Sequence, residues 1–80
     1  MEALRDGERR VVGTKEVLRA VKAGTASRVY VANDADTFLY QRIVRAAEAA
    51  KVPITRVERM KELGEMCGVQ VSAAAAVLIR

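Results

Sequence analysis

The sequence predicts an α/β fold, a three-layer α-β-α sandwich with a small mixed sheet in the middle. Short β-prone runs alternate with segments of helical periodicity along the 80 residues. Hydrophobic residues make up 51% of the chain and are mostly small aliphatics, which suit close packing between helices and a sheet. Proline and glycine are scarce, so the composition is globular. This length predicts one domain, spanning residues 1–80.

A short strand and a helix are predicted first. The β-prone run Arg9–Val12 ends at Gly13, and the hydroxyl of Thr14 is placed to cap the following helix. One stripe of that helix is apolar: Val17, Leu18 and Val21. Gly24 gives the helix a natural end.

A buried strand and a longer helix follow. The apolar run Arg28–Ala32 is typical of a buried strand. The polar cluster Asn33–Asp36 predicts a turn, whose last residue caps the next helix. That helix is expected from Thr37 to Lys51, with apolar residues at helical spacing: Leu39, Ile43, Ala46, Ala47 and Ala50. Pro53 prevents its continuation.

The remainder predicts a strand, a short helix and a tail. Ile54–Val57 alternates apolar and polar residues, as a half-buried strand does. Met60, Leu63 and Cys67 mark one face of a short helix that Gly68 closes. The alanines at 73–76 favour a helix by propensity, whereas residues 77–79 suit a strand, and we predict a strand.

The sequence argues against a catalytic site. The chain has no histidine, so the usual proton shuttle near neutral pH is absent. Cys67 lacks an imidazole base and lies on an apolar stripe, which predicts a core residue. Asp34 and Asp36 could form a carboxylate pair, but a turn and a helix cap account for both. No zinc, dinucleotide or phosphate-loop motif occurs, so no cofactor or metal is expected.

The charge balance limits the classes of partner that the protein is expected to bind. Lys and Arg outnumber Asp and Glu by 14 to 10, and the net charge of +4 attracts nucleic acid or an acidic membrane surface. The same charge can also serve solubility alone. No apolar run reaches the roughly 20 residues of a membrane span, and residues 1–10 lack a signal peptide's apolar stretch. With a single cysteine, this predicts a soluble cytoplasmic protein with no membrane partner.

The start of the first helix is a candidate for contacts with phosphates and bases. Its basic residues share one face at spacings i, i+4 and i+7: Lys15, Arg19 and Lys22. Gly13 and Thr14 bring free backbone N–H groups beside a cation, which suits a phosphate. The Glu16 carboxylate can accept from a base amino group. An ordinary solvated face explains Arg19 and Lys22 equally well, with Glu16 favouring the helix N-terminus through the dipole.

A second candidate is the glycine-bounded segment Gly68-Val69-Gln70-Val71. Val69 and Val71 can belong to the core. Their position in a loop also permits an apolar surface on which an unstacked base rests.

Four motifs occur in one order: Gly13-Thr14-Lys15-Glu16 with Arg19, Val31-Ala32-Asn33-Asp34-Ala35-Asp36, Lys61-Glu62-Leu63-Gly64 and Gly68-Val69-Gln70-Val71. Each motif is weak alone, but four in register are specific. From about Val11 to Ile79, the chain resembles the kink-turn-binding ribosomal protein family of the large-subunit seven-Ae and thirty-e type. More narrowly, it resembles the short bacterial members of that family.

The resemblance implies an α-β-α sandwich that binds kink-turn RNA, a duplex bent at an internal loop next to tandem sheared G·A pairs. The start of the first helix would enter the major groove at those pairs, through Gly13, Thr14, Lys15, Glu16 and Arg19. Asp36 would lie near a flipped-out base, Lys61 would face a phosphate, and extruded nucleotides would pack on Val69, Gln70 and Val71. The resemblance further implies a non-catalytic ribosomal or ribosome-associated protein, monomeric when free, that binds structured RNA such as ribosomal RNA or a riboswitch.

Two positions depart from the family. Lys15 stands where archaeal and eukaryotic relatives commonly carry Asn, and lysine can donate but cannot accept a hydrogen bond. Gln70 stands where Glu is common, which removes a negative charge near RNA. Both changes are expected to affect which RNA sequences the protein prefers. RNA binding itself is still expected.

Two other classes of protein stay open. One is a protein-interaction module on the same fold, with the basic helix facing an acidic partner. The other is a small enzyme or nucleotide-binding domain, against which the missing histidine and phosphate loop both argue.

Overall fold

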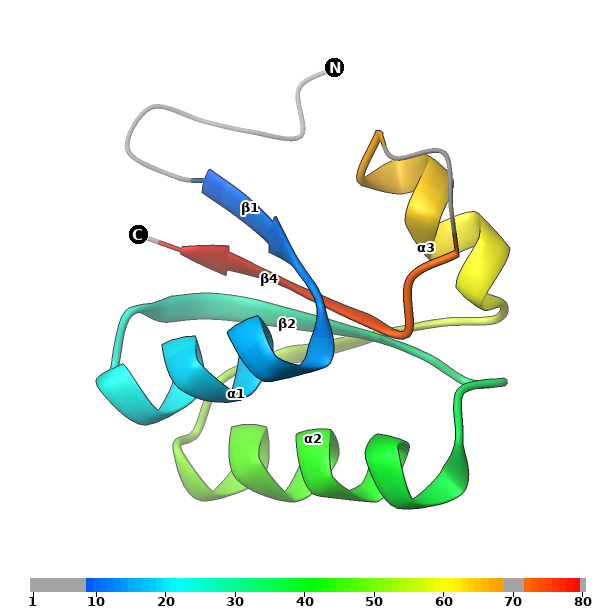
Figure 1. The fold of residues 1–80 in the computed structure, drawn as a ribbon. Helices are drawn as coiled ribbons and strands as arrows, with labels where there is room; N and C mark the ends of the chain where they lie inside the picture. The colour runs from blue at the N-terminus through cyan, green and yellow to red at the C-terminus, as the bar shows by residue number, and fades with distance from the viewer. Residues whose placement is uncertain (1–8, 69–71, 80) are drawn as a thin grey trace.

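The computed structural model describes residues 9–68 and 72–79, and strands and helices alternate within them as predicted. In chain order they are β1 (Arg9–Val12), α1 (Thr14–Ala23), β2 (Ala26–Ala32), α2 (Thr37–Ala49), β3 (Ile54–Val57), α3 (Met60–Met66) and β4 (Ala75–Ile79), as Figure 1 shows. Among these residues, no helix is long and apolar enough to cross a membrane.

The strands of the described ranges form one mixed sheet in the order β1-β4-β2-β3. β4 runs antiparallel to both of its neighbours, whereas β2 and β3 are parallel and joined through α2. The last of the described strands therefore lies inside the sheet, where Ala75, Ala76 and Val77 are completely buried. Pairing on both sides and burial on both faces explain why the alanine-rich tail is a strand despite its helix propensity.

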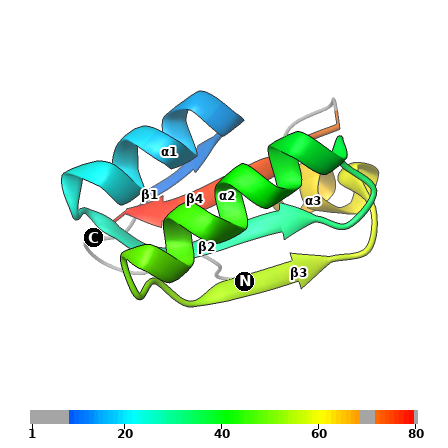
Figure 2. The same cartoon turned by 90° about the horizontal axis from the view of Figure 1, so that it is seen from below.

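Helices cover both faces of the sheet, which confirms the three-layer sandwich. α1 and α2 lie side by side on one face, and α3 covers part of the other (Figures 1 and 2). The alternation of β2 divides the core accordingly. Val29 and Val31 pack with α1 and α2, whereas Tyr30 and Ala32 face the cluster around Leu63 of α3.

The start of α1 differs from the prediction that Thr14 caps it. Thr14 is the first helical residue, Gly13 is the N-cap, and no side chain within residues 9–68 and 72–79 caps the helix. Gly13 adopts φ 125°, a region that strains any other residue, and its N–H is bonded to the Ala75 carbonyl at 3.0 Å. Because of this hydrogen bond to β4, the helix starts one residue earlier than it would with Thr14 as its N-cap.

The end of α2 also differs from the prediction. The helix stops at Ala49, short of Lys51, which has φ 60°. Lys51 N–H donates to the Glu48 carbonyl at 3.1 Å and Val52 N–H to the Ala47 carbonyl at 2.8 Å. These two bonds form a Schellman motif, which ends the helix before Pro53 has to.

Cys67 borders the core. The residue is half-buried at the C-cap of α3 and packs against the cluster around Leu63. Burial raises the pKa of its thiol, and the nearby guanidinium of Arg10 offsets part of this effect. The Cys67 side chain is thus less buried than the sequence predicts for a core residue.

Candidate nucleic-acid interface

Four chain segments meet at one end of the sheet: the junction of β1 and α1, the turn after β2, the start of α3 and the residues before β4 (Figure 1). Three backbone hydrogen bonds join them: Gly13 N–H to Ala75 O at 3.0 Å, Ala32 N–H to Ala74 O at 2.9 Å, and Ala73 N–H to Met60 O at 3.1 Å. Motifs far apart in the sequence therefore share one rigidly connected end of the molecule.

The first turn of α1 presents backbone donors at this end. Val17 N–H makes the first helical bond, to the Gly13 carbonyl at 2.9 Å. No side chain of the described residues caps the helix, so the preceding amides of Thr14, Lys15 and Glu16 remain available to an external acceptor. The amides and the exposed Lys15 side chain have the chemistry that suits a phosphate oxygen.

Glu16 and Arg19 add a carboxylate and a cation one turn apart. Oε1 of Glu16 lies 3.9 Å from Nη1 of Arg19, and the two side chains are 46% and 66% exposed. An exposed pair of this kind contributes only about 0.2–1 kcal/mol, so a ligand can separate it at little cost. The structure thus brings together the residues predicted at the helix tip: Gly13, Thr14, Lys15, Glu16 and Arg19.

Asp36 caps α2, as the sequence predicts. Its Oδ1 accepts from the N–H groups of Phe38 at 3.0 Å and Leu39 at 3.3 Å. Within the described chain Oδ2 has no hydrogen-bond partner, so this oxygen is free to accept from a ligand.

Asp34 has a role that sequence reasoning missed. Its Oδ1 accepts from the N–H of Met60 at 2.8 Å and so caps α3, whose N-cap residue Arg59 makes no side-chain cap bond. The bond ties the acidic turn to α3 across 26 positions. A partner so distant leaves no local signal in the sequence.

Phe38 is a second residue that the sequence analysis left out. Its side chain is 78% exposed, two positions after Asp36 in the first turn of α2. The signal was present, because the only phenylalanine of the chain falls off the apolar stripe of its helix. An exposed aromatic ring offers a stacking surface to an unpaired base.

Lys61 occupies the second position of α3 and is exposed. Because α3 packs on the opposite face of the sheet from α1, Lys61 and Lys15 belong to different helical layers. The start of α3 is nevertheless held at the same end through Asp34. The other predicted contacts, Val69, Gln70 and Val71, lie outside the described residues.

The last turn of α3 is held by a contact from β1. Nη1 of Arg10 donates to the carbonyl of Met66, directly before Cys67.

In the described ranges, no group of three or more His, Cys, Asp or Glu side chains could hold a metal ion.

The sequence model of the ribosomal protein L7Ae/L30e/S12e/Gadd45 family matches residues 1–80. The chain belongs to this family. It is 49% identical over 70 residues to an RNA-binding protein of Geobacillus thermodenitrificans, a match that covers 88% of this chain and 85% of the relative. The RNA-binding protein YbxF of Geobacillus stearothermophilus is 47% identical over the same shares of each chain.

Solved structures agree with the family's fold. The 15.5kD RNA binding protein of Giardia lamblia superposes with a TM-score of 0.82 at 29% identity, over 89% of this chain. This chain covers 60% of the length of the Giardia chain. A Bacillus halodurans protein of unknown function superposes with a TM-score of 0.80 at 18% identity, which shows the shared fold alone.

Proposed function

We propose that the chain is a non-catalytic, monomeric RNA-binding protein that recognises and stabilises kink-turn RNA in a ribosomal or ribosome-associated setting. One observation carries the proposal: the uncapped start of α1, with exposed Lys15 and Arg19 and the carboxylate of Glu16, shares one end of the sheet with the acidic turn. Family membership and the names of the bacterial relatives support RNA as the ligand.

The helix tip suits a bent duplex better than a straight one. A regular A-form helix has a deep, narrow major groove whose base edges side chains cannot reach. A kink opens that groove and crowds phosphates on its inner side. The free amides of α1 with Lys15 and Arg19 bind those phosphates, while Glu16 accepts from a base amino group at the G·A pairs.

The second contact region lies beside α2. The free Oδ2 of Asp36 accepts from a base extruded at the bend, and the exposed ring of Phe38 stacks on it. Lys61 faces a backbone phosphate. The segment of Val69, Gln70 and Val71 packs against further extruded nucleotides.

The protein acts by selecting a conformation of the RNA. Its contacts require an open groove and crowded phosphates, so it binds the kinked form more tightly than the straight form. Differential affinity then shifts the RNA towards the kink. Because phosphate contacts release counterions, the affinity falls as salt concentration rises.

The direct test compares two RNAs. A kink-turn duplex and a matched duplex with Watson–Crick pairs in place of the G·A pairs are titrated with the protein by isothermal calorimetry. The protein binds the kink-turn far more tightly. Equal affinity for the two RNAs, or no binding to either, contradicts the proposal.

A further inference from the structure

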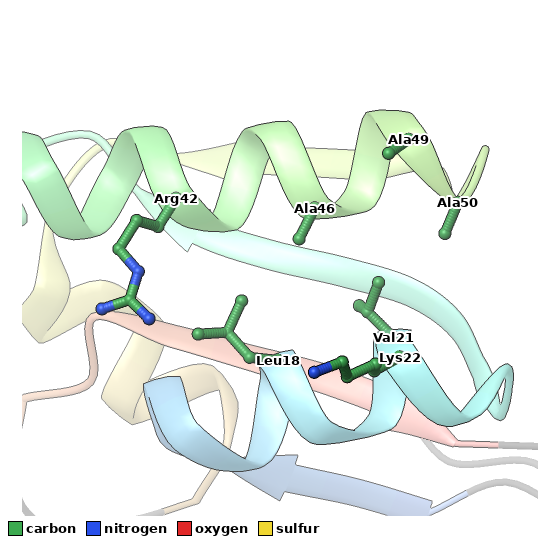
Figure 3. Close-up of a pocket in the computed structure, with 7 residues that line it drawn as sticks. All are labelled: Leu18, Val21, Lys22, Arg42, Ala46, Ala49 and Ala50. Atoms are coloured by element: carbon green, nitrogen blue, oxygen red, sulfur yellow. The ribbon is translucent and has the colours of Figure 1, made fainter.

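A groove of about 470 Å³ runs between α1 and α2, apart from the end of the sheet described above. Its apolar lining comes from Leu18 and Val21 of α1 and from alanines of α2 and its C-cap (Figure 3). Arg42 reaches from α2 towards α1, and the side chain of Lys22 lies alongside Leu18. The groove thus combines an apolar floor with two cationic side chains.

These two cations are available to a partner. Neither Lys22 nor Arg42 makes an ion pair or a hydrogen bond to a described residue. No carboxylate stands among the described residues that line the groove. Helices α1 and α2 together carry five basic and two acidic residues. The basic residues are Lys15, Arg19, Lys22, Arg42 and Arg45, and the acidic ones are Glu16 and Glu48. The surface therefore attracts a negatively charged occupant.

The alanines that line the groove leave room for a helix of a partner. Ala46, Ala49 and Ala50 follow each other at spacings of three and one along α2, so they form a low ridge without long side chains. Low ridges let a second helix approach to about 8–10 Å between axes. From Arg42 to Ala50 the groove follows about 12 Å of α2, a little more than two helical turns.

We propose that this groove docks an acidic amphipathic helix of a protein partner. The apolar face of that helix covers Leu18 and the alanine ridge, and its carboxylates meet Lys22 and Arg42. A second copy of this chain fits poorly, because two equally basic layers would repel each other. RNA also fits less well, since Lys22 and Arg42 can meet its phosphates but its backbone has no aliphatic face to cover Leu18 and the alanines.

The groove begins close to the proposed RNA surface, because Arg19 directly follows Leu18 in α1. Leu18 lies one turn beyond Thr14, and Arg42 lies nearly two turns beyond Asp36. This inference stands apart from the proposed RNA function, because peptide binding is measured without RNA.

The test uses a labelled synthetic helical peptide of about 12 residues, with Leu and Ala on one face and Glu beside them. Fluorescence anisotropy measures its binding to the full chain, against a peptide of the same composition in scrambled order. The amphipathic peptide binds at least about tenfold more tightly than the scrambled one. Equal binding of both peptides, or none of either, overturns the proposal.

Matched variants locate the site. Arg42→Glu weakens peptide binding about tenfold, whereas Arg45→Glu, the same charge change on the same helix outside the groove lining, weakens it much less. Ala49→Arg adds a positive charge but obstructs the ridge, so it also weakens binding. Circular dichroism melts confirm that each variant folds.

Four results overturn the assignment. If Arg42→Glu and Arg45→Glu lose peptide affinity equally, only the overall charge of the protein matters. If Ala49→Arg binds the peptide more tightly, the alanine ridge does not contact it. Displacement of the peptide by kink-turn RNA, together with a larger loss of RNA affinity in Arg42→Glu than in Arg45→Glu, makes the groove an RNA surface. Sedimentation that shows a dimer disrupted by Ala49→Arg makes it a contact between copies of the chain.

Discussion

At the tip of α1, a carboxylate stands among cations. Glu16 follows Lys15 in the chain and lies 3.9 Å from the guanidinium of Arg19. A carboxylate near RNA repels phosphate, so it favours binding only where it accepts from a base edge. Cations at the same place attract any phosphate, whatever the sequence. The three residues should therefore separate into one that gives specificity and two that give affinity.

Glu16→Ala is expected to weaken binding to a kink-turn RNA by about 1–3 kcal/mol, with little effect on a plain duplex. Arg19→Ala is the matched variant one turn further on. It should weaken binding to both RNAs and lower the salt slope by about one phosphate contact. Titrations at several salt concentrations separate the two effects. An equal loss for both RNAs in Glu16→Ala would show that Glu16 acts through helix stability instead.

The raised pKa of Cys67 gives the fold a dependence on alkaline pH. Burial raises the pKa of this thiol above its ordinary value of 9.0, although Arg10 opposes the shift. The folded state thus holds the thiol proton more tightly than the unfolded state does. This contribution to stability is fully present below the unfolded pKa and is lost as pH rises through the folded pKa.

Cys67→Ala should therefore lose less unfolding free energy than the natural chain as pH rises from neutral through and beyond the ordinary thiol pKa of 9.0. Urea denaturation at a series of pH values measures the difference, and the alanine variant controls for pH effects that do not involve the thiol. Parallel pH profiles in the two proteins would show that the thiol is not shifted.

At the scale of elements, local signals predicted most of the structure. The caps and ends set by Asp36 and Gly24 follow from contacts within a few residues, and both appear where the sequence placed them. Thr14 was misplaced as a cap because Gly13 and Thr14 are both plausible locally. The choice between them depends on the tie from Gly13 to Ala75, which is distant in the chain.

The link from Asp34 to the start of α3 carries a prediction at this scale. Asp34→Ala removes the only side-chain cap bond that the described chain gives Met60 N–H, and should cost about 1–2 kcal/mol of stability. Asp34→Asn keeps an acceptor oxygen and should cost much less. Chemical denaturation compares the two variants. Equal losses would assign the effect to the charge and not to the cap.

At the scale of the whole molecule, the order of the sheet assembles the candidate site. β4 is the last of the described strands but lies between β1 and β2, which brings Ala75 against Gly13 and Ala74 against Ala32. The motifs predicted candidate segments, and the structure brings the described ones together at one end of the sheet. The motifs could not reveal the groove between α1 and α2, which depends on packing. The exposure of Phe38 did have a local signal, because this residue falls off the apolar stripe of its helix.

The proposed function requires that the α1 tip selects the bent form of the RNA. The most direct measurement is fluorescence energy transfer between dyes on the two arms of a kink-turn duplex, at an ionic strength where most molecules are extended. Addition of the protein should raise the transfer efficiency to that of the kinked form, and Glu16→Ala should need a higher concentration to do so. Binding of the protein with no change in transfer efficiency would contradict the account.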